Sequence, residues 1–224
     1  MVIKGRKAIV FLLPVLICFI CGCSHSNSTS SLPENAFGLH LSSDPSEKVI
    51  MSTVNRRVNW AVDYSDMEVL VGDSDLIVIA TVESIDKTIA RSGFYSTFAT
   101  IHISETLKGE SSPDISIVSM GGYVSYEEYV KGLQEGDLAK QDLNWTEEEK
   151  QNGVVKAQVD QQNLLQEGEQ YILCLRESEE LGYVTVGSYH GIMRIYGEKV
   201  WRKENAGIFD KEDIIQSILK AQEQ

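Results

Sequence analysis

A serine and a histidine that could act together in catalysis lie close to one another in the C-terminal part of the chain. They are Ser188 and His190, in the stretch Gly187-Ser188-Tyr189-His190-Gly191. A serine nucleophile beside a histidine base is the arrangement of many hydrolases. The nucleophile elbow Gly-x-Ser-x-Gly is not formed, however, because Ser188 directly follows Gly187 and is one position too early. A glycine-bounded loop between strands explains the same residues, so no catalytic residue is assigned and the hydrolase remains an alternative.

The other histidines and the cysteines do not indicate a metal site. The sequence has four of each, without an HExxH motif or a paired-histidine spacing. His102 is expected on the polar face of a strand, beside Thr100 and Ser104. Cys174 stands in an apolar run and is expected to be a buried, inert thiol. The sequence therefore predicts no metal and no cofactor.

Aromatic side chains gather in one region that lacks the strand pattern of its neighbours. Residues 122–163 contain two capping boxes, at Ser125–Glu128 and Thr146–Glu149, which predict two short helices in an insertion. The aromatic residues of this insertion are Tyr123, Tyr126, Tyr129 and Trp145. They either attach the insertion to the rest of the domain or form a binding surface, and both interpretations stay open.

The elements around the insertion are predicted to be mainly short strands. Alternating or continuous apolar runs cover residues 76–82, 94–105, 114–120, 170–175, 183–186, 191–196 and 199–201. The run 76–82 is long and β-branched enough for a central strand buried on both faces. Strands at this hairpin spacing favour a small antiparallel barrel. Residues 49–64 are expected to pack on the edge of the domain.

Helices are predicted on either side of these strands. Ser65 and Glu68 form a capping box that opens a short helix reaching Val71, which Gly72 ends. A final helix starts at Asp210 and places four aliphatic side chains on one stripe: Ile214, Ile215, Ile218 and Leu219. This stripe is expected to be buried against the barrel.

Composition and charge narrow the class of protein. The 224 residues are 42% hydrophobic and 24% charged, which is typical of a globular chain. The net charge of −13 argues against a nucleic-acid partner, whose phosphates require clustered lysine and arginine. Four cysteines are too few for a disulfide-rich scaffold.

The N-terminus has the anatomy of an export signal. Lys4, Arg6 and Lys7 precede an apolar run over residues 8–20. This run is too short for a membrane span, which needs about 20 residues. Residues 24–47 are rich in serine, asparagine and proline and are expected to form a flexible tether.

The end of this signal resembles the lipobox of bacterial lipoproteins, in the residues Ile20-Cys21-Gly22-Cys23. The resemblance implies cleavage after Gly22 and a diacylglyceryl thioether on Cys23. Cleavage would remove three basic residues and no acidic ones, so the net charge would fall from −13 to −16. A surface this acidic is repelled by anionic headgroups, so attachment to the membrane would depend on the acyl chains. The expected organisation is a signal over 1–22, a tether over 23–47 and a barrel domain over 48–224.

Three segments of the sequence, over residues 75–82, 103–109 and 165–175, resemble a class of exported bacterial proteins with OB-like barrels. These proteins are distantly similar in layout to the netrin-like domains of metalloproteinase inhibitors. These segments correspond to strands and turns and contain no catalytic group, so the resemblance implies a fold and no activity. Inhibition of metalloproteinases is not expected, because those inhibitors use a free N-terminal cysteine and Cys23 would be lipidated.

Together these observations predict a lipid-anchored protein on the extracytoplasmic face of the cell membrane. We expect a non-catalytic accessory or binding protein whose partner is an envelope protein or a glycan. Its contacts are expected from the insertion, through Tyr123, Tyr126, Tyr129 and Trp145, and from the adjacent barrel mouth. The alternatives are an envelope hydrolase using Ser188 and His190, and a purely structural component of the envelope.

The lipid anchor gives a direct prediction. Replacing Cys23→Ala removes the thiol that would carry the lipid, so the protein is expected to leave the membrane fraction. Cell fractionation followed by immunoblotting measures this. A Cys23→Ala protein that stays in the membrane fraction at its mature size would contradict the lipobox interpretation.

Overall fold

The structure, a computed structural model, describes residues 49–59, 61–91, 94–133, 144–159, 164–202 and 207–224. They belong to one compact unit, His40–Gln224. The export signal, Cys23 and the tether lie outside the described residues. Within the described part of the chain, no helix combines the length and the apolar character that a membrane span requires.

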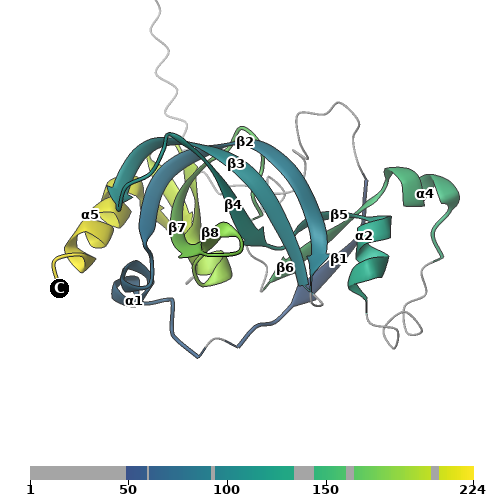
Figure 1. Cartoon of the computed structure of the whole chain (residues 1–224), viewed down its shortest axis with the longest axis horizontal. Helices are drawn as coiled ribbons and strands as arrows, with labels where there is room; N and C mark the ends of the chain where they lie inside the picture. Colours follow the sequence, from purple (N-terminus) through teal and green to yellow (C-terminus); the bar gives the residue numbers. More distant parts are fainter. Residues whose placement is uncertain (1–48, 60, 92–93, 134–143, 160–163, 203–206) are drawn as a thin grey trace, which may run out of the picture. The chain divides into compact units, whose positions relative to one another are not determined.

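Five strands close into a ring, the small barrel that the strand pattern predicts (Figure 1). They are β2 (Leu76–Arg91), β3 (Phe94–Lys108), β4 (Asp114–Met120), β7 (Gln170–Ser178) and β8 (Gly182–Thr185). The order around the ring is β2-β3-β4-β8-β7, and β7 pairs with β2 again. The pairings are antiparallel except β4–β8, which is parallel and closes the barrel.

Strand β2 is buried on both faces, as its β-branched run predicts. Alternate side chains of β2 point into the barrel, where they meet the inner faces of the other strands. This inner core contains Leu76, Val78, Ala80, Val82, Ala99, Ile101, Ile117, Tyr171, Leu173, Leu175 and Ile192. The intervening residues Ile77 and Ile79 belong to a second core outside the barrel.

The second core is covered by the C-terminal part of the chain and by a short helix that precedes β2. The sheet continues from β7 through β9 (Ile192–Tyr196), β10 (Lys199–Arg202) and β11 (Gly207–Asp210). A hairpin across Gly197-Glu198 joins β9 to β10. Helices α1 (Met67–Gly72) and α5 (Lys211–Ala221) pack on this side and lie next to each other in Figure 1.

Helix α1 begins one residue later than the sequence predicts. Asp66 is the N-cap residue, and its carboxylate accepts a hydrogen bond of 2.8 Å from the Glu68 amide. The prediction of Ser65 as the cap is therefore wrong. Aspartate and serine are comparable N-cap residues, and here the backbone places the Asp66 carboxylate beside the Glu68 amide, which has no partner within the helix.

The insertion contains the two predicted helices and also two strands that the sequence did not predict. Its elements are β5 (Gly122–Ser125), α2 (Tyr126–Gly132), α4 (Glu147–Asn152) and β6 (Val154–Val159). Strand β6 pairs with β5 on one side and, in parallel, with β1 (Ile50–Arg56) on the other. The edge segment expected at residues 49–64 thus supplies the third strand of a second, smaller sheet.

Helix α5 buries only part of the predicted stripe. Ile214 and Ile218 are 6% and 0% exposed, and Ile215 packs against the second core from a partly buried position. Leu219 is 40% exposed, so its predicted burial is wrong. The buried stripe is therefore narrower than the four predicted residues.

This difference predicts unequal effects of two alanine substitutions in neighbouring positions. Ile218→Ala creates a cavity in the second core and should lower the free energy of unfolding by about 2–5 kcal/mol. Leu219→Ala, the matched control, should change it by no more than about 0.5 kcal/mol. Urea denaturation with linear extrapolation measures both values, and equal losses would contradict the burial described above.

Candidate functional site

Three of the four aromatic residues predicted as a binding surface form an internal stack. Tyr126 and Trp145 lie 5.1 Å apart between ring centroids, and Tyr129 stacks on Trp145 at 6.4 Å. Tyr129 also stacks on Tyr95 of β3 at 6.1 Å and is only 1% exposed. We call Tyr95, Tyr126, Tyr129 and Trp145 the ring stack. Its contacts attach α2 and the segment before α4 to the barrel, which is the first of the two interpretations left open above.

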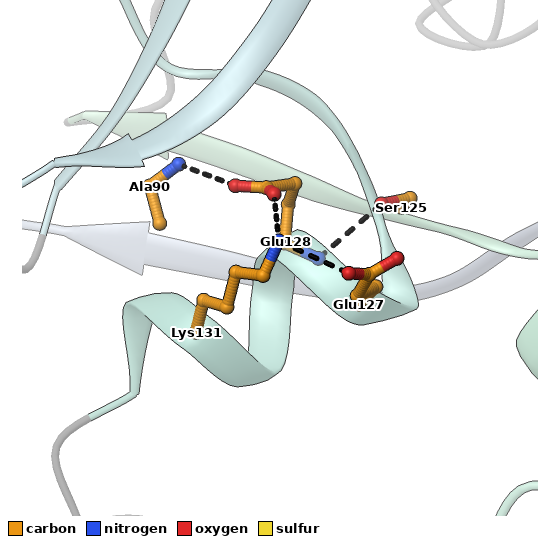
Figure 2. Close-up of polar contacts among 5 residues, drawn as sticks. All are labelled: Ala90, Ser125, Glu127, Glu128 and Lys131. Atoms are coloured by element: carbon orange, nitrogen blue, oxygen red, sulfur yellow. Dashed lines mark hydrogen bonds and ion pairs between the residues drawn. The ribbon is translucent and has the colours of Figure 1, made fainter.

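Polar contacts reinforce this attachment (Figure 2). Ser125 caps α2 by accepting from the Glu128 amide at 3.3 Å, as the sequence predicts. The Glu128 carboxylate does not close the predicted box. It accepts from the Ala90 amide of β2 at 3.2 Å and from Lys131 at 2.6 Å. The bond from Lys131, followed by that from Ala90, lowers the pKa of Glu128, so the carboxylate is charged at neutral pH.

Tyr123, the fourth predicted residue, lies apart from the ring stack. It is half-buried on β5, directly opposite Lys156 of β6, so the two side chains share one face of the small sheet. Burial raises the pKa of Tyr123, while a hydrogen bond with Gln166 and the charge of Arg194 act against that rise. Tyr123 therefore brings the insertion into contact with the barrel.

Arg194 occupies the barrel side of this contact. It lies on the inner face of β9 opposite Tyr171 and is only 9% exposed. Its Nη2 atom donates to Glu169 Oε1 at 2.7 Å, and its guanidinium lies 4.9 Å from the centroid of the Tyr196 ring. The Nε atom is buried and has no hydrogen-bond partner among the described residues. We call Tyr123, Gln166, Glu169, Arg194 and Tyr196 the mouth cluster.

The mouth cluster has the chemistry of a binding site. The Arg194 guanidinium is planar and almost fully buried, and the two tyrosine rings offer apolar faces with polar tips. Gln166 and Glu169 add amide and carboxylate groups of intermediate exposure. Lys156 stands beside Tyr123, and burial lowers the pKa of its ammonium group. These groups can hold a ligand by hydrogen bonds and ring contacts.

Sequence reasoning missed most of the mouth cluster, although one signal was present. Arg194 interrupts the apolar strand Ile192-Met193-Arg194-Ile195 at a position that faces the barrel interior. A charged residue on the buried face of a strand requires a partner of opposite charge. Its partner Glu169 lies just before another strand, and no sequence spacing connects the two.

The residues of the hydrolase alternative lie together but are buried. Ser188 and His190 are 1% and 5% exposed in a single 3₁₀ turn, η1 (Ser188–Gly191), and Ser188 has a φ of 54°. His190 stacks on Tyr189 at 4.0 Å and lines a hollow of about 430 Å³ together with Tyr64 and Asp63. Ser188 does not line this hollow. A nucleophile needs access to its substrate, so the geometry gives this alternative no support.

The two other residues discussed from the sequence occupy the expected environments. Cys174 is fully buried, and the loss of solvation raises the pKa of its thiol to about 12, so it is unreactive in the folded chain. His102 is exposed on β3 and lies 2.6 Å from Asp114. The hydrogen bond to Asp114 raises the pKa of the imidazole.

No protein-family model matches this chain, and a comparison with curated proteins finds no significant match. The fold class that the structure defines is an OB-like barrel with an inserted sheet and helices. Function is therefore argued from the mouth cluster itself.

The ion pair in the mouth cluster predicts that Glu169 contributes to the stability of the fold as well as to the position of Arg194. Glu169→Gln leaves the Arg194 charge buried without its counter-ion and should lower the free energy of unfolding by about 1–3 kcal/mol. Glu198→Gln is the matched control, because the Glu198 side chain is 88% exposed and its ion pair with Lys211 is long, at 3.8 Å. The control should lose less than about 0.5 kcal/mol.

A double variant tests the same pair. Because Arg194→Met removes the charge that Glu169 compensates, Glu169→Gln together with Arg194→Met should be less destabilising than the sum of the two single changes. Additive losses in urea denaturation would show that the two side chains act independently.

Proposed function

We propose that this protein is a lipid-anchored accessory or binding protein of the cell envelope, without catalytic activity. Its partner, an envelope protein or a glycan, binds where the insertion meets the barrel mouth. The observation that carries this proposal is the hydrogen bond of Tyr123 with Gln166 near the charge of Arg194, which links the insertion to the barrel.

The composition of the mouth cluster supports partner binding. Tyrosine and arginine are the residue types that contribute most to binding energy at interfaces. Tyr123 and Tyr196 are half-buried, so their rings are held in place while part of each remains accessible. Arg194 is fixed by Glu169 at 2.7 Å and needs little ordering when a ligand arrives.

The fold and the charge of the chain narrow the kind of partner. OB-type barrels bind oligosaccharides and oligonucleotides with one sheet face and the adjoining loops. The net charge of −13 disfavours a nucleic acid, whose phosphates would be repelled. A neutral or basic surface, such as a glycan or a basic protein segment, fits the acidic chain better.

A photoreactive side chain placed at the mouth tests the proposal in intact cells. A photoreactive amino acid in place of Tyr123 should give a cross-linked adduct on the envelope partner. The same amino acid in place of Gln216, which is exposed on α5, is the matched control and should give none. Digestion of the adduct with a protease or a glycosidase separates a protein from a glycan partner.

Two outcomes would contradict the proposal. Equal adducts from positions 123 and 216 would mean that the mouth is not selective. No adduct from position 123, in a protein that is folded and in the membrane fraction, would favour the purely structural alternative.

The hydrolase alternative has its own test. A Ser188→Ala, His190→Ala double variant should retain the cellular phenotype of the wild type if the protein acts by binding. Deletion of residues 122–163 should abolish that phenotype. The opposite pattern, in a double variant whose circular dichroism is unchanged, would overturn the binding proposal in favour of catalysis.

A further inference from the structure

Three side chains of metal-ligating type meet on the outer surface of the barrel, outside the mouth cluster. They are Glu83 of β2, His102 of β3 and Asp114 of β4, and all three are exposed. One ligand atom from each residue lies within 4.8 Å of the corresponding atoms of the other two. Their separation in the sequence hides this proximity, and the sequence alone predicts no metal site.

The sheet register explains why the three side chains meet. His102 stands directly opposite Asp114 in the β3–β4 ladder and opposite Thr81 in the β2–β3 ladder. A register shift between Val82 and Ser84 makes Glu83 an extra residue of β2 at this point. Such a bulge changes the direction of a side chain, and here Glu83 lies beside the His102–Asp114 pair.

The three strands on which these residues lie all contribute side chains to the inner core of the barrel. The neighbouring side chains that point inward, Val82 and Ile101, are 0% exposed in the inner core of the barrel. Because side chains alternate along a strand, His102 faces solvent next to the buried Ile101, and Glu83 and Asp114 are exposed beside it. A site built on strands with a packed core holds its ligands more accurately than a site built on loops.

The donor set indicates the class of ion. One imidazole and two carboxylates suit divalent transition metals, since imidazole is a good ligand for zinc, nickel and copper. Zinc bonds to such nitrogen and oxygen atoms measure about 2.0–2.2 Å. Exposed side chains separated by at most 4.8 Å can reach these distances through small rotamer changes. The ion would then replace the 2.6 Å contact between His102 Nδ1 and Asp114 Oδ1.

We propose that Glu83, His102 and Asp114 bind one divalent transition-metal ion of the zinc type, with water completing its coordination. Three protein ligands leave an open coordination position on an exposed surface. The two carboxylates balance the charge of the ion, and the acidic chain attracts cations to this surface.

Calorimetric titration of Zn²⁺ into the full chain tests the proposal, after accessible thiols have been alkylated. The wild type should bind Zn²⁺ at this site, and His102→Ala and Glu83→Gln should each lower that affinity at least tenfold. Asp86→Asn and His40→Ala are the matched controls. Asp86 is an exposed carboxylate on the same strand that hydrogen bonds Ser84, and His40 lies outside the described residues. Both controls should stay within about twofold of the wild type.

Several results would overturn the proposal of a metal site. Identical titrations of the wild type and His102→Ala would overturn the proposal, as would a loss in Asp86→Asn equal to that in Glu83→Gln. Loss of binding in His40→Ala would place the metal elsewhere in the chain. Asp114→Asn is a second ligand variant, for use if His102→Ala fails to fold. It should also lower the Zn²⁺ affinity at least tenfold. Tight Ca²⁺ binding that survives His102→Ala would show a site of carboxylates alone, which also overturns the proposal.

Discussion

The burial of β2 on both faces is the constraint on which the rest of the structure depends. Its residues Leu76 and Val78 fill the barrel, while Ile77 and Ile79 on the other face require cover outside it. Each of these side chains gains about 1.5–3 kcal/mol from burial, so neither face can be left to solvent. Helices α1 and α5 and the strands beyond β7 provide the outer cover.

The length of β2 and β3 connects this doubly buried centre to the insertion. Strand β2 has 16 residues and β3 has 15, more than the barrel alone needs. Their far ends carry Ala90 and Tyr95, which hold α2 through Glu128 and the ring stack. At the near end, Lys108 donates from its Nζ to the Val71 carbonyl at the end of α1, at 2.7 Å. One hairpin therefore fixes helices at both of its ends.

The fold was predictable where apolar residues repeat within a single segment, and not where pairing depends on distant residues. The run 76–82 identifies a central strand because every residue in it prefers β structure and burial. Strands β5 and β6 carry polar residues such as Tyr123, Lys156 and Gln158 on the face away from their core, and they are short. Their stability comes from β1 and from the ring stack, which no local pattern reveals.

The residues of the candidate site were likewise predictable only in part. The concentration of aromatic residues in the insertion predicted Tyr123, but the same criterion also selected Tyr129, which is buried. Burial depends on which face of α2 meets β3, and a count of aromatic residues does not contain that information. The pairing of Arg194 on β9 with Glu169, just before β7, is a tertiary contact. The apolar neighbours of Arg194 are the only sign of it in the sequence.

The parallel pairing of β1 with β6 has a consequence for the order in which the protein folds. The two strands are about a hundred residues apart in the chain, and β1 is synthesised first. It must wait unpaired until β6 has been made, whereas β2 and β3 follow one another in the chain and pair with each other. Bringing distant segments together costs chain entropy that local pairing does not. The small sheet, and with it the face that carries Tyr123, is thus expected to assemble after the β2–β3 hairpin.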